Sequence, residues 1–425
     1  MTALMLRSGH KDGHLLAGPL AAGVIGLAPL ATMLVSWIPS TEQAGPATLL
    51  IKGFAVPVLI AELFVILLTL SEPATRRPDL AAPSHYRLAC LAFMVVAAGT
   101  AAFAAPDPVH SYVRTGIIAV HLLFGYSVFR LCKAGMLKPE QLTNGLIAGF
   151  AASFAALLLF GWQVRHVDFN WVHDMPGYVN IRNLAYYTAP MAALMLARLA
   201  VVEDRTRLAW NFACGAAAIG LIFWSGSRGA LVALVGAYAV AALFFSPLRA
   251  PRAWMNALLA GLVGFLAAYM IGSPTLGGMG IERMTESQAL TTGRTDLWMS
   301  SIAPILERPW FGYGEGQTIH VVPYAQTHRI FSAHNIVLQT LLAWGLVGTL
   351  LIAGLAWALA RRVIAAARSG GELLPPALAA MTIAAYSLID GTLYYVLTTA
   401  IFAACVGLLV AAPSTADRDA AATAS

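Results

Sequence analysis

The sequence alternates long apolar stretches with short polar breaks over almost its whole length. A stretch of about 20 apolar residues can cross a bilayer core of roughly 30 Å as an α-helix. Stretches of this kind occur near residues 15–38, 47–70, 87–105, 111–130, 142–163, 183–202, 208–224, 228–245, 253–271, 335–360, 376–392 and 394–412. The pattern predicts an all-α polytopic membrane protein with about twelve transmembrane helices and with both termini on one side.

Composition supports this class. Of the 425 residues, 59% are hydrophobic and 11% are charged, which is too apolar for a soluble domain of this size. The first stretch is longer than the apolar part of a secretory signal and shows no small-residue cleavage site, so we expect a retained helix. The four cysteines show neither a CxxC nor a Cys/His metal spacing, and no disulfide is implied.

Basic residues are distributed unequally between the two sides of the expected membrane. Seventeen of the 26 Lys and Arg lie on the side of the termini, which the positive-inside rule assigns to the cytoplasm. This topology explains the net charge of +6 better than nucleic-acid binding does. The nine outer residues are Lys52, Arg114, Arg165, Arg182, Arg228, Arg283, Arg294, Arg308 and Arg329. Eight are arginine, whose planar fork suits phosphate or carboxylate.

These assignments divide the chain into four regions. Helices one to nine occupy residues 1–271, a large outer loop follows at 272–334, helices ten to twelve occupy 335–412, and 413–425 form a cytoplasmic tail. The tail is rich in Ala, Thr and Ser, which is typical of a disordered end.

The large outer loop is the main candidate for function. Apolar residues at helical spacing predict an amphipathic helix on the membrane surface, which Pro309 ends; its face comprises Leu297, Trp298, Ser301, Ile302, Ile305 and Leu306. The segment 310–316 then alternates aromatic residues with glycines that permit close backbone approach. Such a segment suits the membrane interface or the face of a sugar.

Three expected helices begin at the outer face, at Arg182, Arg228 and His334. A helix N-terminus offers unpaired N–H groups and a partial positive charge, so added arginines favour a phosphate or pyrophosphate. The alternative for Arg228 is snorkelling to the interface or pairing with an acid such as Asp390. Arg294 begins the loop helix, and its alternative is a solvated first-turn residue that pairs with the nearby Asp296.

His334 is the candidate for proton transfer. Positive neighbours favour the neutral imidazole, which can accept a proton from a sugar hydroxyl as a general base or can position the acceptor. The alternative is a helix-capping or interfacial histidine.

A metal site is the weaker hypothesis. Four residues of the first long outer loop could bind a divalent ion, but their spacing matches no established ligand pattern; they are His166, Asp168, His173 and Asp174. No Asp-x-Asp pair lies on the outer side. We therefore expect solvated side chains there, and neither a metal nor another cofactor.

Glu62 and His121 lie inside apolar stretches, where ionisable residues often mark proton or substrate paths. They leave a proton-coupled transporter as an alternative function. The sequence lacks the paired broken helices in two matching halves that favour a transporter, and Glu62 can simply pair inside the bundle.

The second half of the chain resembles the O-antigen ligase and O-antigen polymerase superfamily of bacterial envelope glycosyltransferases. The resemblance rests on Ser225-Gly226-Ser227-Arg228-Gly229-Ala230, Thr292-Gly293-Arg294 through Trp298, Pro309-Trp310-Phe311-Gly312-Tyr313-Gly314, and Ala333-His334-Asn335 with Leu338, Gly345 and Gly348. It implies a GT-C-like fold of about twelve spans with one large periplasmic loop. It also implies metal-independent glycan transfer from undecaprenyl pyrophosphate.

By this resemblance, Arg228 and Arg294 hold the pyrophosphate, Arg182 is a third donor contact, and His334 activates or orients the acceptor. Asn335 and Asp390 are expected to be acceptor-side or supporting residues. The expected function is an O-antigen ligase of the bacterial inner membrane that transfers polysaccharide to lipid A-core at the periplasmic face. An O-antigen or exopolysaccharide polymerase that uses the same donor remains an alternative.

Overall fold

The computed structural model describes residues 2–37, 51–77, 80–272, 293–367 and 371–412. Within these ranges every regular element is a helix. The apolar helices are α1 (Thr2–Val35), α3 (Val56–Ser71), α4 (Ser84–Phe103), α5 (Pro108–Lys133), α6 (Pro139–Val164), α7 (Ile181–Val201), α8 (Arg205–Trp224), α9 (Arg228–Phe244), α10 (Pro251–Ile271), α15 (Ile336–Ala367), α16 (Leu374–Ser387) and α17 (Val396–Ala411). The predicted tail at 413–425 and the outer Arg283 lie outside the described residues.

The all-α polytopic membrane protein predicted from the sequence is confirmed. Each expected stretch overlaps one of these helices, and eight helices in the described ranges are long and apolar enough to cross a membrane. The other four, α3, α9, α16 and α17, are shorter, with 14 to 17 residues. The expected count of about twelve full spans is therefore met by helix position but not by helix length.

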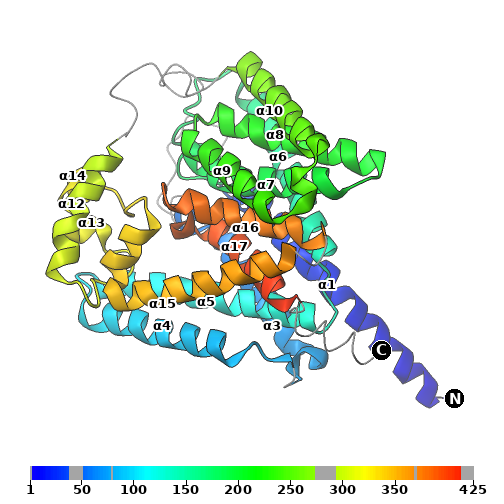
Figure 1. The fold of residues 1–425 in the computed structure, drawn as a ribbon, viewed down its shortest axis with the longest axis horizontal. Coiled ribbons are helices and arrows are strands. Elements are labelled where there is room, and N and C mark those ends of the chain that lie inside the picture. The colour runs from blue at the N-terminus through cyan, green and yellow to red at the C-terminus, as the bar shows by residue number, and fades with distance from the viewer. Residues whose placement is uncertain (1, 38–50, 78–79, 273–292, 368–370, 413–425) are drawn as a thin grey trace.

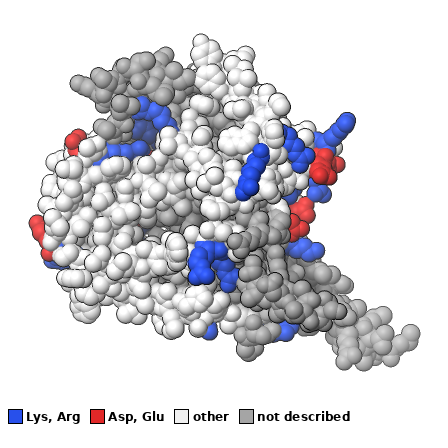
Figure 2. Space-filling view, viewed as in Figure 1, with Lys and Arg blue, Asp and Glu red and all other residues white. Residues whose placement is uncertain are grey.

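Helix α7 is the centre of the bundle, because 89% of its most apolar window is buried. It packs against α8 and α16, whereas α4 and α10 expose most of their surface. Glycines allow helices α1 and α6 to touch along their backbones: a Cβ added to Gly149 would lie 1.7 Å from the carbonyl oxygen of Gly26. Such contacts between small residues are typical of membrane helices. Figure 2 shows Lys and Arg in a few small groups on a mostly uncharged face.

The described part of the large loop folds into three short helices, α12 (Arg294–Glu307), α13 (Thr318–Val321) and α14 (Pro323–His328). They lie at the end of the molecule opposite the start of α1 (Figure 1). The predicted amphipathic helix is α12, whose Leu297 and Ser301 are buried against a small core of the loop, while Ile302 and Leu306 are exposed.

The aromatic and glycine-rich segment of the loop packs against a break in α15. The break lies at Gly345, where φ is +59°, a conformation that favours glycine. The freed groups pair with the loop: Leu346 N donates to Pro309 O at 2.7 Å, and Tyr313 N donates to Leu342 O at 2.8 Å. A Cβ at Gly345 would lie 2.3 Å from the carbonyl carbon of Trp310. The close backbone approach expected of these glycines is thus a contact between the loop and α15.

Candidate active site

Four helices begin near the residues selected from the sequence. Arg182 lies in the first turn of α7, Arg228 is the first residue of α9, Arg294 is the first residue of α12, and His334 lies two residues before α15. Arg182 is exposed and Arg228 is half-buried. The expected helix N-termini are therefore present, and α12 adds a fourth from the loop.

Asp390 joins two of these residues. It lies just beyond α16, where its Oδ2 accepts a hydrogen bond from the guanidinium of Arg294 at 2.5 Å and its Oδ1 lies 2.6 Å from His334 Nδ1. Oδ1 also accepts hydrogen bonds from the Tyr186 hydroxyl at 2.6 Å and from Gly391 N at 2.8 Å. A histidine that donates Nδ1–H to a carboxylate keeps Nε2 as an acceptor.

The surroundings of Asp390 favour its ionised carboxylate at neutral pH. Burial raises its pKa, but the hydrogen bond and charge of His334 and the charge of Arg294 outweigh burial and lower the pKa to about 2. The side chain of Asp390 is 7% exposed, whereas those of Arg294 and His334 are 30% and 33% exposed. Asp390 therefore orients two side chains whose other faces remain accessible.

The start of α9 lies against the last turn of α16. A Cβ added to Gly229 would lie 3.2 Å from the Tyr386 ring and 3.3 Å from Ile389, the residue before Asp390. Tyr386 also forms a side-chain hydrogen bond with Ser227 and interacts electrostatically with Arg182 and Arg294. The three selected arginines thus belong to elements that surround the end of α16.

Asn335 holds the backbone around His334. Its Oδ1 accepts hydrogen bonds from Val337 N at 2.9 Å and Leu338 N at 3.1 Å, and its Nδ2 donates to Leu388 O at 2.8 Å. Asn335 therefore caps α15 in place of His334 and ties it to the end of α16. His334 itself has φ of +49°, a left-handed conformation that is uncommon for residues other than glycine and clusters at functional sites.

One alternative pairing considered from the sequence is wrong. Arg294 pairs across 96 residues with Asp390, and not with the neighbouring Asp296. Asp390 also pairs with His334.

Two buried tyrosines that contact the site, Tyr186 and Tyr386, were not selected from the sequence. Tyr186 follows Arg182 by four residues on α7, and Tyr386 precedes Asp390 by four residues. Because residues four apart share a helix face, this spacing was a usable signal.

Other charged residues considered from the sequence have partners outside the Arg294–Asp390–His334 arrangement. Glu62 Oε1 lies 2.7 Å from His121 Nδ1 inside the bundle. Outer Arg308 donates to Ala104 O, and outer Arg165 donates to Trp162 O. In the described ranges no three His, Cys, Asp or Glu side chains form a group that could hold a metal ion, and His166, Asp168 and His173 are exposed.

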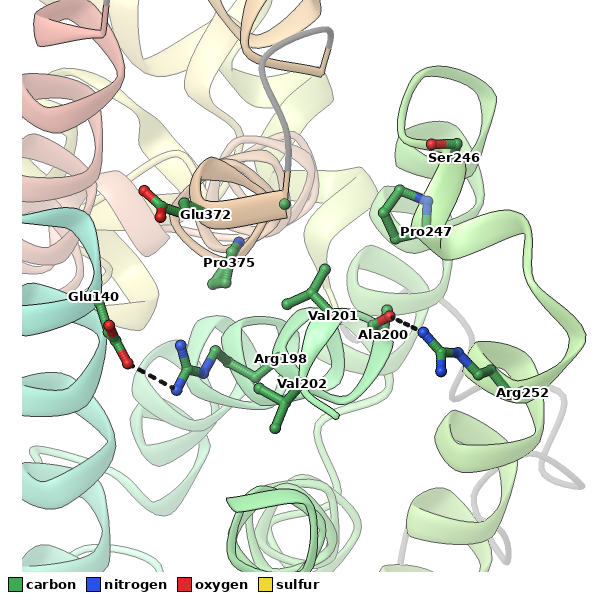
Figure 3. A pocket seen from close by; sticks show the side chains of 11 residues that line it. Glu140, Arg198, Ala200, Val201, Val202, Ser246, Pro247, Arg252, Glu372 and Pro375 are labelled. Atoms are coloured by element: carbon green, nitrogen blue, oxygen red, sulfur yellow. Dashed lines mark hydrogen bonds and ion pairs between the residues drawn. The ribbon is translucent and has the colours of Figure 1, made fainter. Parts of the chain in front are cut away.

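A cavity of about 570 Å³ lies where α7 ends and α10 begins (Figure 3). Acidic and basic side chains line this cavity. Arg198 lies 3.9 Å from Glu140, and Arg252 donates a hydrogen bond to Ala200 O at 3.5 Å. Arg198 and Arg252 belong to the side assigned to the cytoplasm. This cavity contains none of the selected site residues.

The sequence profile of a family described as O-antigen ligase matches residues 212–353. The match supports the O-antigen ligase superfamily. It confirms the resemblance predicted from the motifs, and the matched segment contains Arg228, Arg294 and His334. O-antigen ligase family members are glycosyltransferase-like enzymes of O-antigen and polysaccharide processing. No curated protein matches the chain.

Proposed function

We propose that the chain is an O-antigen ligase that transfers a polysaccharide from undecaprenyl pyrophosphate to lipid A-core. The transfer takes place at the periplasmic face of the inner membrane, inverts the anomeric carbon and uses no metal ion. The observation that carries this proposal is the Arg294–Asp390–His334 arrangement, at the point where arginine-bearing helices begin.

The donor pyrophosphate fits the positive side of this site. Arg182, Arg228 and Arg294 bring guanidinium groups to the N-termini of α7, α9 and α12, where backbone N–H groups also favour anions. A guanidinium has five N–H donors, so Arg294 can hold Asp390 and a phosphate oxygen together. Each charge-assisted hydrogen bond contributes roughly 1.5 to 3 kcal/mol.

A groove in the bundle supports a lipid carrier. It encloses about 860 Å³ between α6, α8 and α10 and extends along α8 to Trp224, four residues before Arg228. Small residues form its floor, and a Cβ on Gly264 would lie 2.5 Å from Ala216 O. In the proposed binding mode, an isoprenoid chain lies in this groove and its pyrophosphate lies at the start of α9.

The acceptor side of the reaction belongs to His334. An acceptor hydroxyl attacks the anomeric carbon, the new glycosidic C–O bond forms, and the bond to the pyrophosphate oxygen breaks. Nε2 of His334 takes the hydroxyl proton while Asp390 holds the Nδ1–H. The leaving pyrophosphate keeps the electron pair, and the arginines stabilise its charge.

Transfer from one defined carrier-linked glycan, measured in excess chelator, tests this function. One reaction receives lipid A-core and the other receives a second carrier-linked glycan. We expect the product on lipid A-core; product only on the second carrier identifies a polymerase, and activity that requires an added divalent ion contradicts the metal-free reaction. Substrate movement into liposomes without any transfer supports the transporter alternative, in which Glu62 and His121 act.

A further inference from the structure

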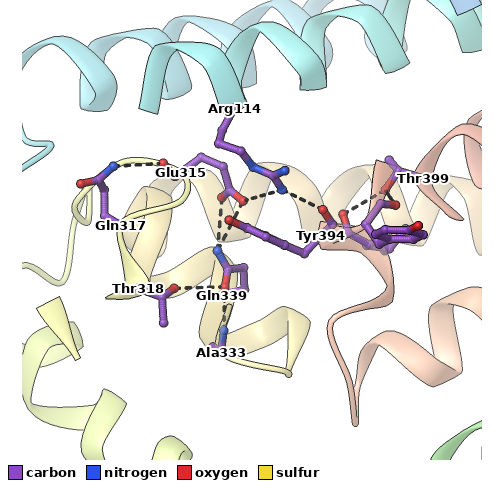
Figure 4. A network of polar contacts seen from close by, with 10 residues as sticks. Arg114, Glu315, Gln317, Thr318, Ala333, Gln339, Tyr394 and Thr399 are labelled. Carbon is purple, nitrogen blue, oxygen red and sulfur yellow. Dashed lines mark hydrogen bonds and ion pairs between the residues drawn. The ribbon is translucent and has the colours of Figure 1, made fainter. Parts of the chain in front are cut away.

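A second buried polar cluster contacts the backbone just before His334. It consists of Arg114 from α5, Glu315 from the loop and Gln339 from the first turn of α15 (Figure 4). Their exposed fractions are 8%, 4% and 6%. The sequence assigned Arg114 to the outer arginines, but the structure uses its charge internally, 3.9 Å from Glu315.

One end of this cluster holds the residue before His334. Gln339 Oε1 accepts a hydrogen bond from Ala333 N at 2.9 Å and another from the Thr318 hydroxyl at 3.4 Å. Gln339 Nε2 faces both carboxylate oxygens of Glu315 at 3.4 Å. The backbone that leads into His334 is therefore fixed through Gln339 to Glu315.

The other end holds the segment that carries Asp390. Arg114 donates to Tyr394 O at 2.7 Å, and its guanidinium lies 3.7 Å over the Tyr394 ring. Tyr394 N donates to Gly391 O at 3.0 Å, and Gly391 N donates to Asp390 Oδ1 at 2.8 Å. One chain of contacts thus links the backbone of His334 to that of Asp390.

Stability alone is a poor explanation for this cluster. A buried ion pair loses hydration that its attraction often fails to repay. Four buried polar atoms beside it have no hydrogen-bond partner among the described residues: Arg114 Nε, His110 Nε2, Ser111 Oγ and Thr115 Oγ1. Partly satisfied polar clusters cost stability in a low-dielectric interior. The gain therefore lies in fixing geometry.

We propose that Arg114, Glu315 and Gln339 are positioning residues that set how His334 meets Asp390. The proposal rests on the proposed transferase function for its effect on turnover. Its effect on the His334–Asp390 contact does not depend on that function, because the contact is part of the fold.

Glu315→Gln and Gln339→Leu test the proposal in the full-length protein. The matched control is Glu62→Gln, which removes a similarly buried acid of α3 whose partner His121 lies on α5, the helix that also carries Arg114. The readouts are kcat, donor KM, the thermal transition, and the rate at which diethyl pyrocarbonate modifies His334, followed by mass spectrometry. The last readout needs no substrate.

We expect both cluster variants to lower kcat roughly tenfold to hundredfold with donor KM within about twofold, because small displacements of catalytic groups cost rates of this order. The modification rate of His334 should change in both variants and stay at the wild-type value in Glu62→Gln. Unchanged modification of His334 in both folded cluster variants overturns the proposal. Changed modification in a protein whose wild type transfers no glycan keeps the positioning role and rejects the transferase function.

Discussion

Two carboxylate–imidazole pairs with nearly equal geometry occupy different parts of this molecule. The Glu62–His121 contact is 2.7 Å and the Asp390–His334 contact is 2.6 Å. The first pair is buried between α3 and α5, and its histidine side chain is 6% exposed. The second lies where helices begin, with its histidine 33% exposed. The difference shows that access and nearby helix N-termini, and not the residue pair itself, distinguish a candidate reaction centre from an internal contact.

The largest effect should separate the two histidines. We expect His334→Ala to lower transfer roughly 10²- to 10⁴-fold, the range attributed to a general base, while the protein remains folded and inserted. His121→Ala should keep the turnover per folded molecule, because its imidazole faces Glu62 and not the site. Glycan transfer by purified variants, normalised to the folded fraction, measures both. Equal losses in the two variants would abolish the distinction between the pairs.

The next effect concerns Arg228 and Arg294, which begin α9 and α12 around the second pair. Arg228→Lys and Arg294→Lys keep the charge but lose the planar fork. We expect kcat/KM to fall roughly tenfold to hundredfold, the equivalent of one charge-assisted hydrogen bond. Arg165→Lys is the matched control, since exposed outer Arg165 stacks on Trp162 away from the site. Wild-type turnover by Arg228→Lys would count against a pyrophosphate clamp.

The sequence revealed the helices because an apolar stretch needs only local composition to be recognised. Arg294 and His334 could also be selected from the sequence, because each begins or precedes an expected helix. Their contact with Asp390 could not be predicted, since 96 and 56 residues of chain separate them from it. The expected helix at 376–392 places Asp390 within a membrane span, but α16 ends at Ser387, so Asp390 lies beyond the helix. The burial of Arg114 against Glu315 could not be predicted either, because 201 residues of chain separate the two side chains.

A smaller effect should come from the apolar groove beside α8. Ala217→Phe places bulk among the small residues that line the groove. Because each buried methylene contributes about 0.8 kcal/mol, we expect KM for a long-chain carrier to rise roughly three- to tenfold. Leu262→Phe is the control, since this exposed residue of α10 lies outside the groove. A donor with a short isoprenoid should be unaffected; an equal rise in its KM would show a general disturbance of the site.

The smallest effect is expected on mild acidification. The folded-state pKa of Asp390 is about 2, below the ordinary value of 3.8. Its ionised form therefore stabilises the fold above the ordinary value, and this contribution is lost as pH falls toward about 2. The difference in thermal stability between wild type and Asp390→Asn should stay constant from neutral pH to about pH 5 and shrink only below the ordinary value. A difference that disappears at higher pH would mean that Arg294 and His334 do not hold the carboxylate ionised, and the contrast with the Glu62–His121 pair would then rest on exposure alone.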